Sequence, residues 1–142
     1  MNKVYIIAEA GVNHNGKLSL AKKLIEKASY SGANAIKFQT FIASEEISKH
    51  APKAKYQKKS TSLSQLKMAQ KLELNEKDHK SLISFAKKMK IDFISSPFDI
   101  KSIILLNKLK LKKIKIPSGE INNLPYLRKL GKLNKEIILS TG

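Results

Sequence analysis

The sequence alternates short runs rich in β-branched residues with longer stretches of helical periodicity, and this alternation constrains the fold more than any other feature. It predicts β/α units that form a parallel sheet. Strands are expected at residues 4–8, 35–38, 92–95, 112–116 and 136–139, and helices at residues 17–31, 62–71, 75–90, 100–109 and 125–130. The predicted fold class is therefore α/β, with parallel β/α units forming about the first half of a (β/α)8 TIM barrel, which typically needs ~250 residues.

The sequence stops directly after the last predicted strand, with Ser140, Thr141 and Gly142. A strand without its covering helix leaves one sheet face bare and one edge unpaired. The chain has 142 residues and 42% hydrophobic content, enough for one domain with a continuous core. We therefore expect residues 1–142 to form the N-terminal part of the barrel of a larger enzyme, with the irregular segment 39–60 as a loop over its site.

The formal net charge of +17 would suit a polyanionic partner such as a nucleic acid. However, Arg128 is the only arginine and aromatic residues make up 6% of the chain, so bidentate base contacts and stacking surfaces are nearly absent. A small anionic ligand fits the charge at least as well. The chain also has no cysteine, no apolar run long enough to span a membrane and no export signal. These observations predict a cytoplasmic protein without nucleic-acid or membrane partners.

Charged and polar side chains gather where the predicted strands end. The carboxyl ends of parallel strands meet at one rim, and ligands bind there. The candidates for this rim are Glu9, Lys37, Gln39, Ser96, Lys115, Ser118, Glu120 and Ser140. Lysines and hydroxyls suit a phosphate or carboxylate ligand. Each residue alone also has a structural interpretation, such as a carboxylate partner for Lys37 or a helix cap for a serine, but the coincidence across the strands favours a site.

His14 lies in a turn that Gly11 and Gly16 bracket. Because no second histidine or close carboxylate accompanies it at ligand spacing, the sequence predicts a turn-stabilising role rather than a metal site. We assign no site role to His50 or His79.

Five segments carry a resemblance to a known family. In chain order they are IAEAGVNHNG, KFQTF, SSPFD, KIPSGEINNLPYL and IILSTG, at the family's order and approximate spacing along the whole chain. The chain thereby resembles the sialic acid synthase family. Members of that family condense phosphoenolpyruvate with an N-acetylmannosamine-type sugar to a nonulosonic acid, a nine-carbon 2-keto acid, and release phosphate.

The resemblance implies roles for the rim residues. Glu9 matches the family's acidic residue near the reacting carbons and is the catalytic candidate. The other matches are substrate contacts: on the sugar side Gln39 and Glu120, and at the phosphate and carboxylate of phosphoenolpyruvate Lys37, Ser96, Lys115, Ser118 and Ser140.

Within the family, the segment 37–41, the Tyr56-Gln57 pair and Pro117 resemble the legionaminic acid branch. This implies 2,4-diacetamido-2,4,6-trideoxymannose as the sugar, with N-acetylneuraminate synthase as the alternative. The resemblance also implies a homodimer and a divalent metal, Mn2+ or Mg2+. The histidine ligands of that metal and an antifreeze-like domain belong to a C-terminal part that this chain does not contain, so we expect the chain alone to be an inactive fragment.

Two further interpretations remain open. In one, Lys37 or Lys115 is the Schiff-base lysine of a metal-independent aldolase, because lysines at barrel strand ends also serve that role. In the other, the chain is a non-catalytic truncated half-barrel that binds its missing half.

Overall fold

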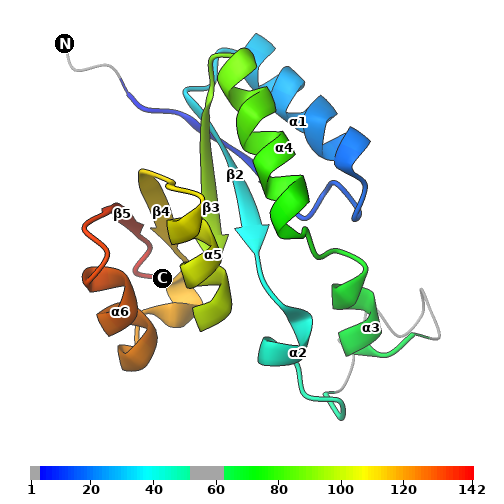
Figure 1. Ribbon diagram of the computed structural model, residues 1–142, viewed down its shortest axis with the longest axis vertical. Coiled ribbons are helices and arrows are strands. Elements are labelled where there is room, and N and C mark those ends of the chain that lie inside the picture. Colours follow the sequence, from blue (N-terminus) through cyan, green and yellow to red (C-terminus); the bar gives the residue numbers. More distant parts are fainter. Residues whose placement is uncertain (1–3, 52–62) are drawn as a thin grey trace.

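The computed structural model describes residues 4–51 and 63–142. These residues form a parallel sheet of five strands in the order β1-β2-β3-β4-β5 (Figure 1). The strands are β1 (Ile7–Gly11), β2 (Ala35–Thr40), β3 (Asp92–Pro97), β4 (Lys113–Ile116) and β5 (Glu136–Leu139). A doubly wound sheet reverses its strand order at a switch point, whereas consecutive neighbours are the order of a (β/α)8 barrel. The predicted α/β class and half-barrel architecture are confirmed.

Helices follow each of the first four strands, as the β/α pattern requires (Figure 1). They are α1 (Leu18–Tyr30), α2 (Ala43–Glu46), α3 (Gln65–Gln70), α4 (Glu76–Lys88), α5 (Ile100–Lys108), the 3-10 helix η1 (Ser118–Glu120) and α6 (Leu124–Gly131). The short helix α2 lies in the segment that the sequence analysis expected to be irregular. The Tyr56-Gln57 pair lies outside the described residues.

The helix ends follow local chemistry that the sequence already shows. The predicted cap at Asn75 is confirmed, because its side chain accepts from Asp78 N–H at 3.0 Å and Asp78 returns the contact to Asn75 N–H at 3.1 Å. Asp99 caps α5 by accepting from Ser102 N–H at 2.7 Å. Gly32 ends α1 with a φ of +78°, a left-handed conformation that glycine adopts without a steric penalty.

The prediction for the first strand was wrong by three residues. It was expected at residues 4–8, but β1 runs from Ile7 to Gly11, because Ile7 aligns with Ala35, the first residue of β2. Val4 and Tyr5 precede the strand and are exposed. As a result Glu9 lies within a paired strand rather than in the loop that follows it.

The strands β2 and β3 also continue two residues further than predicted, to Thr40 and Pro97. All six residue pairs between these strands stay in register up to Thr40 and Pro97. Since successive side chains of a strand point to opposite faces, this extension decides which polar residues face the helices and which face the inner side of the sheet.

Two apolar clusters fill the layer between the sheet and the helices. One lies among α1, α4, β1 and β2, and the other among β4, α5 and α6. Phe93 on β3 packs against both clusters, and its ring stacks on Phe38 with centroids 5.1 Å apart. Phe93 therefore joins the two parts of the core.

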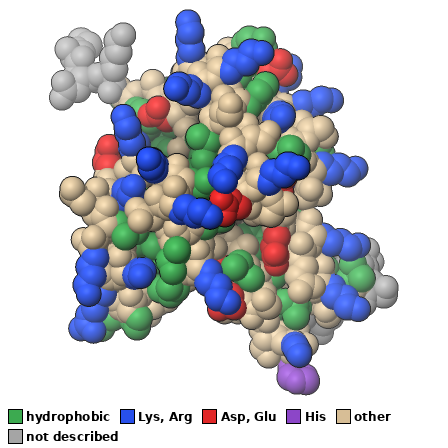
Figure 2. Space-filling view, in the orientation of Figure 1, with side chains coloured by type: hydrophobic (Ala, Val, Ile, Leu, Met, Phe, Trp, Pro, Cys, Tyr) green, Lys and Arg blue, Asp and Glu red, His purple; other side chains and the backbone are tan. Residues whose placement is uncertain are grey.

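Lysine and arginine side chains are spread across the face drawn in Figure 2, without gathering in a single stripe. Among the described residues, no helix combines the length and the apolar character needed to cross a membrane.

Candidate functional site

A carboxylate and an ammonium group form an ion pair on the inner face of β1 and β2, which is the face of the sheet turned away from the helices. Glu9 and Lys37 are register partners, and Lys37 Nζ lies 2.6 Å from Glu9 Oε2. The Lys37 side chain is 15% exposed and the Glu9 side chain 52%. Lys37 thus has the carboxylate partner that its structural interpretation predicted. An ammonium has three donor hydrogens, however, so the pair with Glu9 leaves donors for a ligand.

Lys115 on β4 supplies a second cation to the same face. Burial, followed by the positive charge of Lys37, lowers the pKa of Lys115, and the charge of Glu9 partly opposes this effect. Lys115 Nζ donates one hydrogen bond to the Ile116 carbonyl at 2.8 Å. Because the two ammonium groups repel each other, an anion bound between them would be stabilised by both.

Gln39 and Ser96 complete this group of side chains. Gln39 pairs in register with Ser96, two residues beyond Lys37 along β2. A Cβ added at Gly11, whose φ is +52°, would lie 3.3 Å from Glu9 Oε1 and 3.9 Å from Gln39 Nε2, so the Gln39 amide and the Glu9 carboxylate lie near each other. We call Glu9, Lys37, Gln39, Ser96 and Lys115 the inner-face group.

Ser96 is the member of the inner-face group with an unused polar atom. Its hydroxyl is buried and has no hydrogen-bond partner among the described residues. A buried polar group without a partner costs about 1–3 kcal/mol. A ligand oxygen that accepts from Ser96 Oγ would remove this cost, which makes the site suited to an anion.

The structure places the other three predicted site residues further along the rim. Ser118 begins η1 and is exposed, Glu120 accepts from Asn123 Nδ2 at 2.6 Å, and the Ser140 backbone donates to the Ile116 carbonyl at 3.2 Å. Within the described ranges, their side chains make no hydrogen bond or ion pair with the inner-face group. The structure thus brings five of the eight candidates together.

Sequence reasoning missed a buried chain of polar groups directly behind the inner-face group. Thr40 Oγ1 lies 2.8 Å from His79 Nε2 and 2.6 Å from Ser95 Oγ, and His79 Nδ1 lies 2.9 Å from the Asn75 carbonyl oxygen. Burial lowers the pKa of His79, which favours the neutral ring. Its Nδ1–H then donates to Asn75, and its Nε2 accepts from Thr40. We call Thr40, His79 and Ser95 the buried polar chain.

The predicted turn role of His14 is confirmed. His14 is buried, and its Nδ1 accepts from the Gly16 backbone N–H at 3.0 Å. Over the described part of the chain, no three histidine, cysteine, aspartate or glutamate side chains are grouped so that they could hold a metal ion. The described residues therefore do not fit the divalent metal that the family resemblance implies.

These features define a class: a parallel β/α barrel protein whose strand ends present two lysines, a carboxylate and a free hydroxyl to an anionic ligand. A model of the NeuB family matches residues 24–142. The chain belongs to the NeuB family, and the resemblance to sialic acid synthases is confirmed.

Three relatives illustrate the similarity. The chain is 64% identical over its whole length to the N,N'-diacetyllegionaminic acid synthase of Campylobacter jejuni, of which it covers 43%. It is 49% identical to the enzyme of the same name from Legionella pneumophila, over 97% of the chain and 39% of that protein. The crystal structure of N-acetylneuraminic acid synthetase from Leptospira borgpetersenii, in complex with citrate, matches with a TM-score of 0.86 and 32% identity, over 99% of the chain and 45% of that protein. The chain thus spans less than half the length of each.

Proposed function

We propose that the chain forms the phosphoenolpyruvate-holding side of a nonulosonic acid synthase. The observation that carries the proposal is the pair of lysines, Lys37 and Lys115, on one face beside the unpartnered Ser96 hydroxyl. Phosphoenolpyruvate has a phosphate and a carboxylate, and two cations with a hydroxyl donor match these two anionic groups. Ser118 and Ser140 would extend the contacts to this ligand, and residues 1–142 would be the N-terminal part of the barrel.

Similarity to two legionaminic acid synthases supports 2,4-diacetamido-2,4,6-trideoxymannose as the sugar substrate. An N-acetylmannosamine substrate, as in N-acetylneuraminate synthase, is the alternative. Gln39 and Glu120 would contact the sugar. We further propose that the complete enzyme is a cytoplasmic homodimer that needs Mn2+ or Mg2+, with ligands outside the described residues.

In the proposed reaction, C3 of phosphoenolpyruvate attacks the open-chain sugar aldehyde and forms the new C–C bond. Water adds at C2, and the C–O bond to phosphate breaks, so that phosphate leaves with the bonding electrons. Lys37 and Lys115 neutralise and orient the anionic groups, and Ser96 donates to one of their oxygens. Glu9, paired with Lys37 and half exposed, directs the water or a sugar hydroxyl.

The binding half of the proposal is tested by titrating phosphoenolpyruvate into the chain. We expect saturable binding, and a loss of affinity of about ten- to a hundredfold in Lys37→Gln or Lys115→Gln, since a charge-assisted hydrogen bond contributes about 1.5–3 kcal/mol. Lys23→Gln, a substitution of an exposed lysine on α1, is the matched control. Equal affinity in all four proteins would contradict the proposal.

The catalytic half is tested by phosphate release from phosphoenolpyruvate and the sugar. The chain alone is expected to be inactive, and a chimera that continues it with the remaining C-terminal part of the Campylobacter jejuni relative is expected to be active. Glu9→Gln in that chimera should lower kcat. Unchanged turnover would exclude the role given to Glu9, and activity from the chain alone would show that the chain is no inactive fragment.

The lowered pKa of Lys115 also favours a second candidate function, a Schiff-base aldolase, because such a lysine must lose its proton to attack a carbonyl. Treatment of the chimera with pyruvate and borohydride distinguishes the two functions by mass spectrometry. A synthase gives no adduct and loses activity with a chelator. An adduct at Lys115, with activity that survives the chelator, would identify the aldolase.

A further inference from the structure

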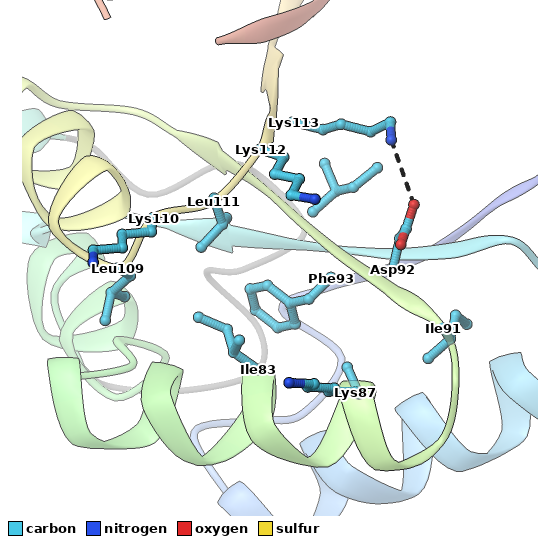
Figure 3. Close-up of a pocket in the computed structure, with 12 residues that line it drawn as sticks. Ile83, Lys87, Ile91, Asp92, Phe93, Leu109, Lys110, Leu111, Lys112 and Lys113 are labelled. Atoms are coloured by element: carbon cyan, nitrogen blue, oxygen red, sulfur yellow. Dashed lines mark ion pairs between the residues drawn. The ribbon is translucent and has the colours of Figure 1, made fainter.

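We propose that the chain has a second anion site, a cavity at the amino-terminal ends of β3 and β4 that accepts a small organic acid with an apolar body. The cavity has a volume of about 500 Å3 and lies between α4, the start of β3 and the turn that leads into β4 (Figure 3). Cavities of about 300–1,000 Å3 are the usual size for small-molecule sites. The proposal does not depend on the proposed function.

The cavity is separate from the inner-face group. Its wall on β3 runs from Asp92 to Ile94, whereas Ser96 lies two residues beyond Ile94 along the same strand. With a rise of about 3.3 Å per residue, Ser96 is about 7 Å from the nearest wall position and about 13 Å from Asp92. Of the inner-face group, no residue lines the cavity.

Apolar side chains form the inner wall. Figure 3 shows Ile83 of α4, Phe93 of β3 and Leu111 of the turn before β4 converging on the same space. Phe93 is the residue at which the two core clusters meet, so the cavity lies along the seam between them. The turn passes through Lys110, whose φ of +58° lets the chain reverse and places Leu111 in the wall.

Lysines surround this apolar wall. Lys87, Lys110, Lys112 and Lys113 all line the cavity, together with a single acidic residue, Asp92. Asp92 is already engaged, because it lies 3.5 Å from Lys113 Nζ and accepts a hydrogen bond from the Tyr5 hydroxyl.

The other three lysines have no carboxylate partner within 4.0 Å among the described residues. Lys113 also lies 3.5 Å from Glu136, so the four lysines with Asp92 and Glu136 leave a local charge of +2 around an apolar pocket. In Figure 3, Lys87 and Lys112 lie on either side of the Phe93 ring. An organic acid would bury its body against Phe93 and Ile83 and place its carboxylate at these ammonium groups, whereas a bare inorganic anion would leave the apolar wall unused.

The test uses three probes that separate charge from shape: 3-phenylpropionate, its neutral amide, and inorganic phosphate. Each is titrated into the isotopically labelled chain and followed by backbone amide shifts in NMR. We expect saturable shifts with 3-phenylpropionate at Ile83, Phe93 and Leu111, binding of the amide that is about three- to tenfold weaker, and no saturation at these residues with phosphate.

Variants then test the assignment of the charge. The double variant Lys87→Gln/Lys112→Gln should bind the acid and the amide with equal, weak affinity. Lys77→Gln, which changes an exposed lysine of α4 that does not line the cavity, should keep the preference for the acid.

Three results would overturn the proposal: equal affinity of the wild-type chain for the acid and the amide, displacement of the acid by phosphoenolpyruvate, or shifts confined to the inner-face group. A third variant, Ile83→Trp, fills the cavity and should abolish binding of the acid while leaving the spectrum of a folded chain. Unchanged binding in this variant would also place the acid elsewhere.

Discussion

The ends of β2 and β3 carry polar residues on both faces, and the two faces differ in how those residues are satisfied. On the helix side, Thr40 and Ser95 are hydrogen-bonded to each other, and Thr40 also bonds to His79. On the inner side, Ser96 is 1% exposed, much like Ser95 at 0%, yet it has no partner among the described residues. Burial alone therefore does not separate the two serines. Hydrogen bonding does, because buried polar groups in stable proteins normally have partners.

The largest expected effect concerns the helix side. His79→Ala removes a fully buried ring and leaves Thr40 without its acceptor, so the free energy of unfolding should fall by about 3 kcal/mol, measured by urea denaturation. His50→Ala, at an exposed position, is the control and should change stability by less than about 0.5 kcal/mol. Similar losses in both variants would mean that the buried polar chain does not stabilise the fold.

The adjacent serines give the sharpest version of the comparison. Ser95→Ala should cost about 1–2 kcal/mol of unfolding free energy and leave phosphoenolpyruvate affinity unchanged. Ser96→Ala removes a buried hydroxyl that has no partner among the described residues, so it should raise the free energy of unfolding by up to about 1–3 kcal/mol and weaken phosphoenolpyruvate binding by up to about tenfold. If Ser96→Ala instead destabilised the chain as much as Ser95→Ala, the assignment of Ser96 to the ligand side would be wrong.

The two buried histidines make stability depend on pH. Burial lowers the pKa of both His14 and His79 below the ordinary value of 6.5, so the unfolded chain binds more protons than the folded chain in mildly acidic solution. Stability is then complete above about pH 6.5 and falls as the pH drops below it, by up to about 1.4 kcal/mol per pH unit for each histidine. His79→Gln should reduce this slope between about pH 5 and 6.5, as seen in urea titrations. An unchanged slope would show that His79 is not the group that titrates.

The smallest expected effect lies on the inner face. Because burial and Lys37 lower the pKa of Lys115, phosphoenolpyruvate affinity should begin to fall at a lower pH than an ordinary lysine would give. Lys115→Arg keeps its charge and should shift this decline upward, with a change in affinity of less than about tenfold. Binding curves measured from neutral to alkaline pH compare the two proteins, and coincident declines would argue against a role for the Lys115 charge.

The sequence predicted the order and type of the main elements well because each has local signals. The last strand, Glu136–Leu139, has the predicted bounds, and Asn75 and Gly32 mark helix ends through their own backbone chemistry. The first strand was misplaced because the apolar run 4–8 looks like a strand by itself, whereas its true limits depend on pairing with Ala35.

The candidate site was predicted in part, for a similar reason. The predicted third strand ends at Ser95, so Ser96 falls in the loop that follows and is assigned to no face of the sheet. The observed strand continues to Pro97, so the two serines point to opposite faces. The partners of the buried polar chain are also distant in sequence, with Thr40 separated from His79 by 39 positions and from Ser95 by 55. No local pattern could predict those contacts.

The Glu9 carboxylate competes with any bound anion for the Lys37 ammonium group. Any anion that approaches Lys37 must do better than a carboxylate already 2.6 Å away, and a small monoanion such as chloride gains little by doing so. A ligand with two anionic groups can engage Lys115 and Ser96 at the same time and is less affected by the competition. The chain has a net charge of +17 and attracts anions over much of its surface, so for the proposed ligand this competition would favour the inner face over other lysines.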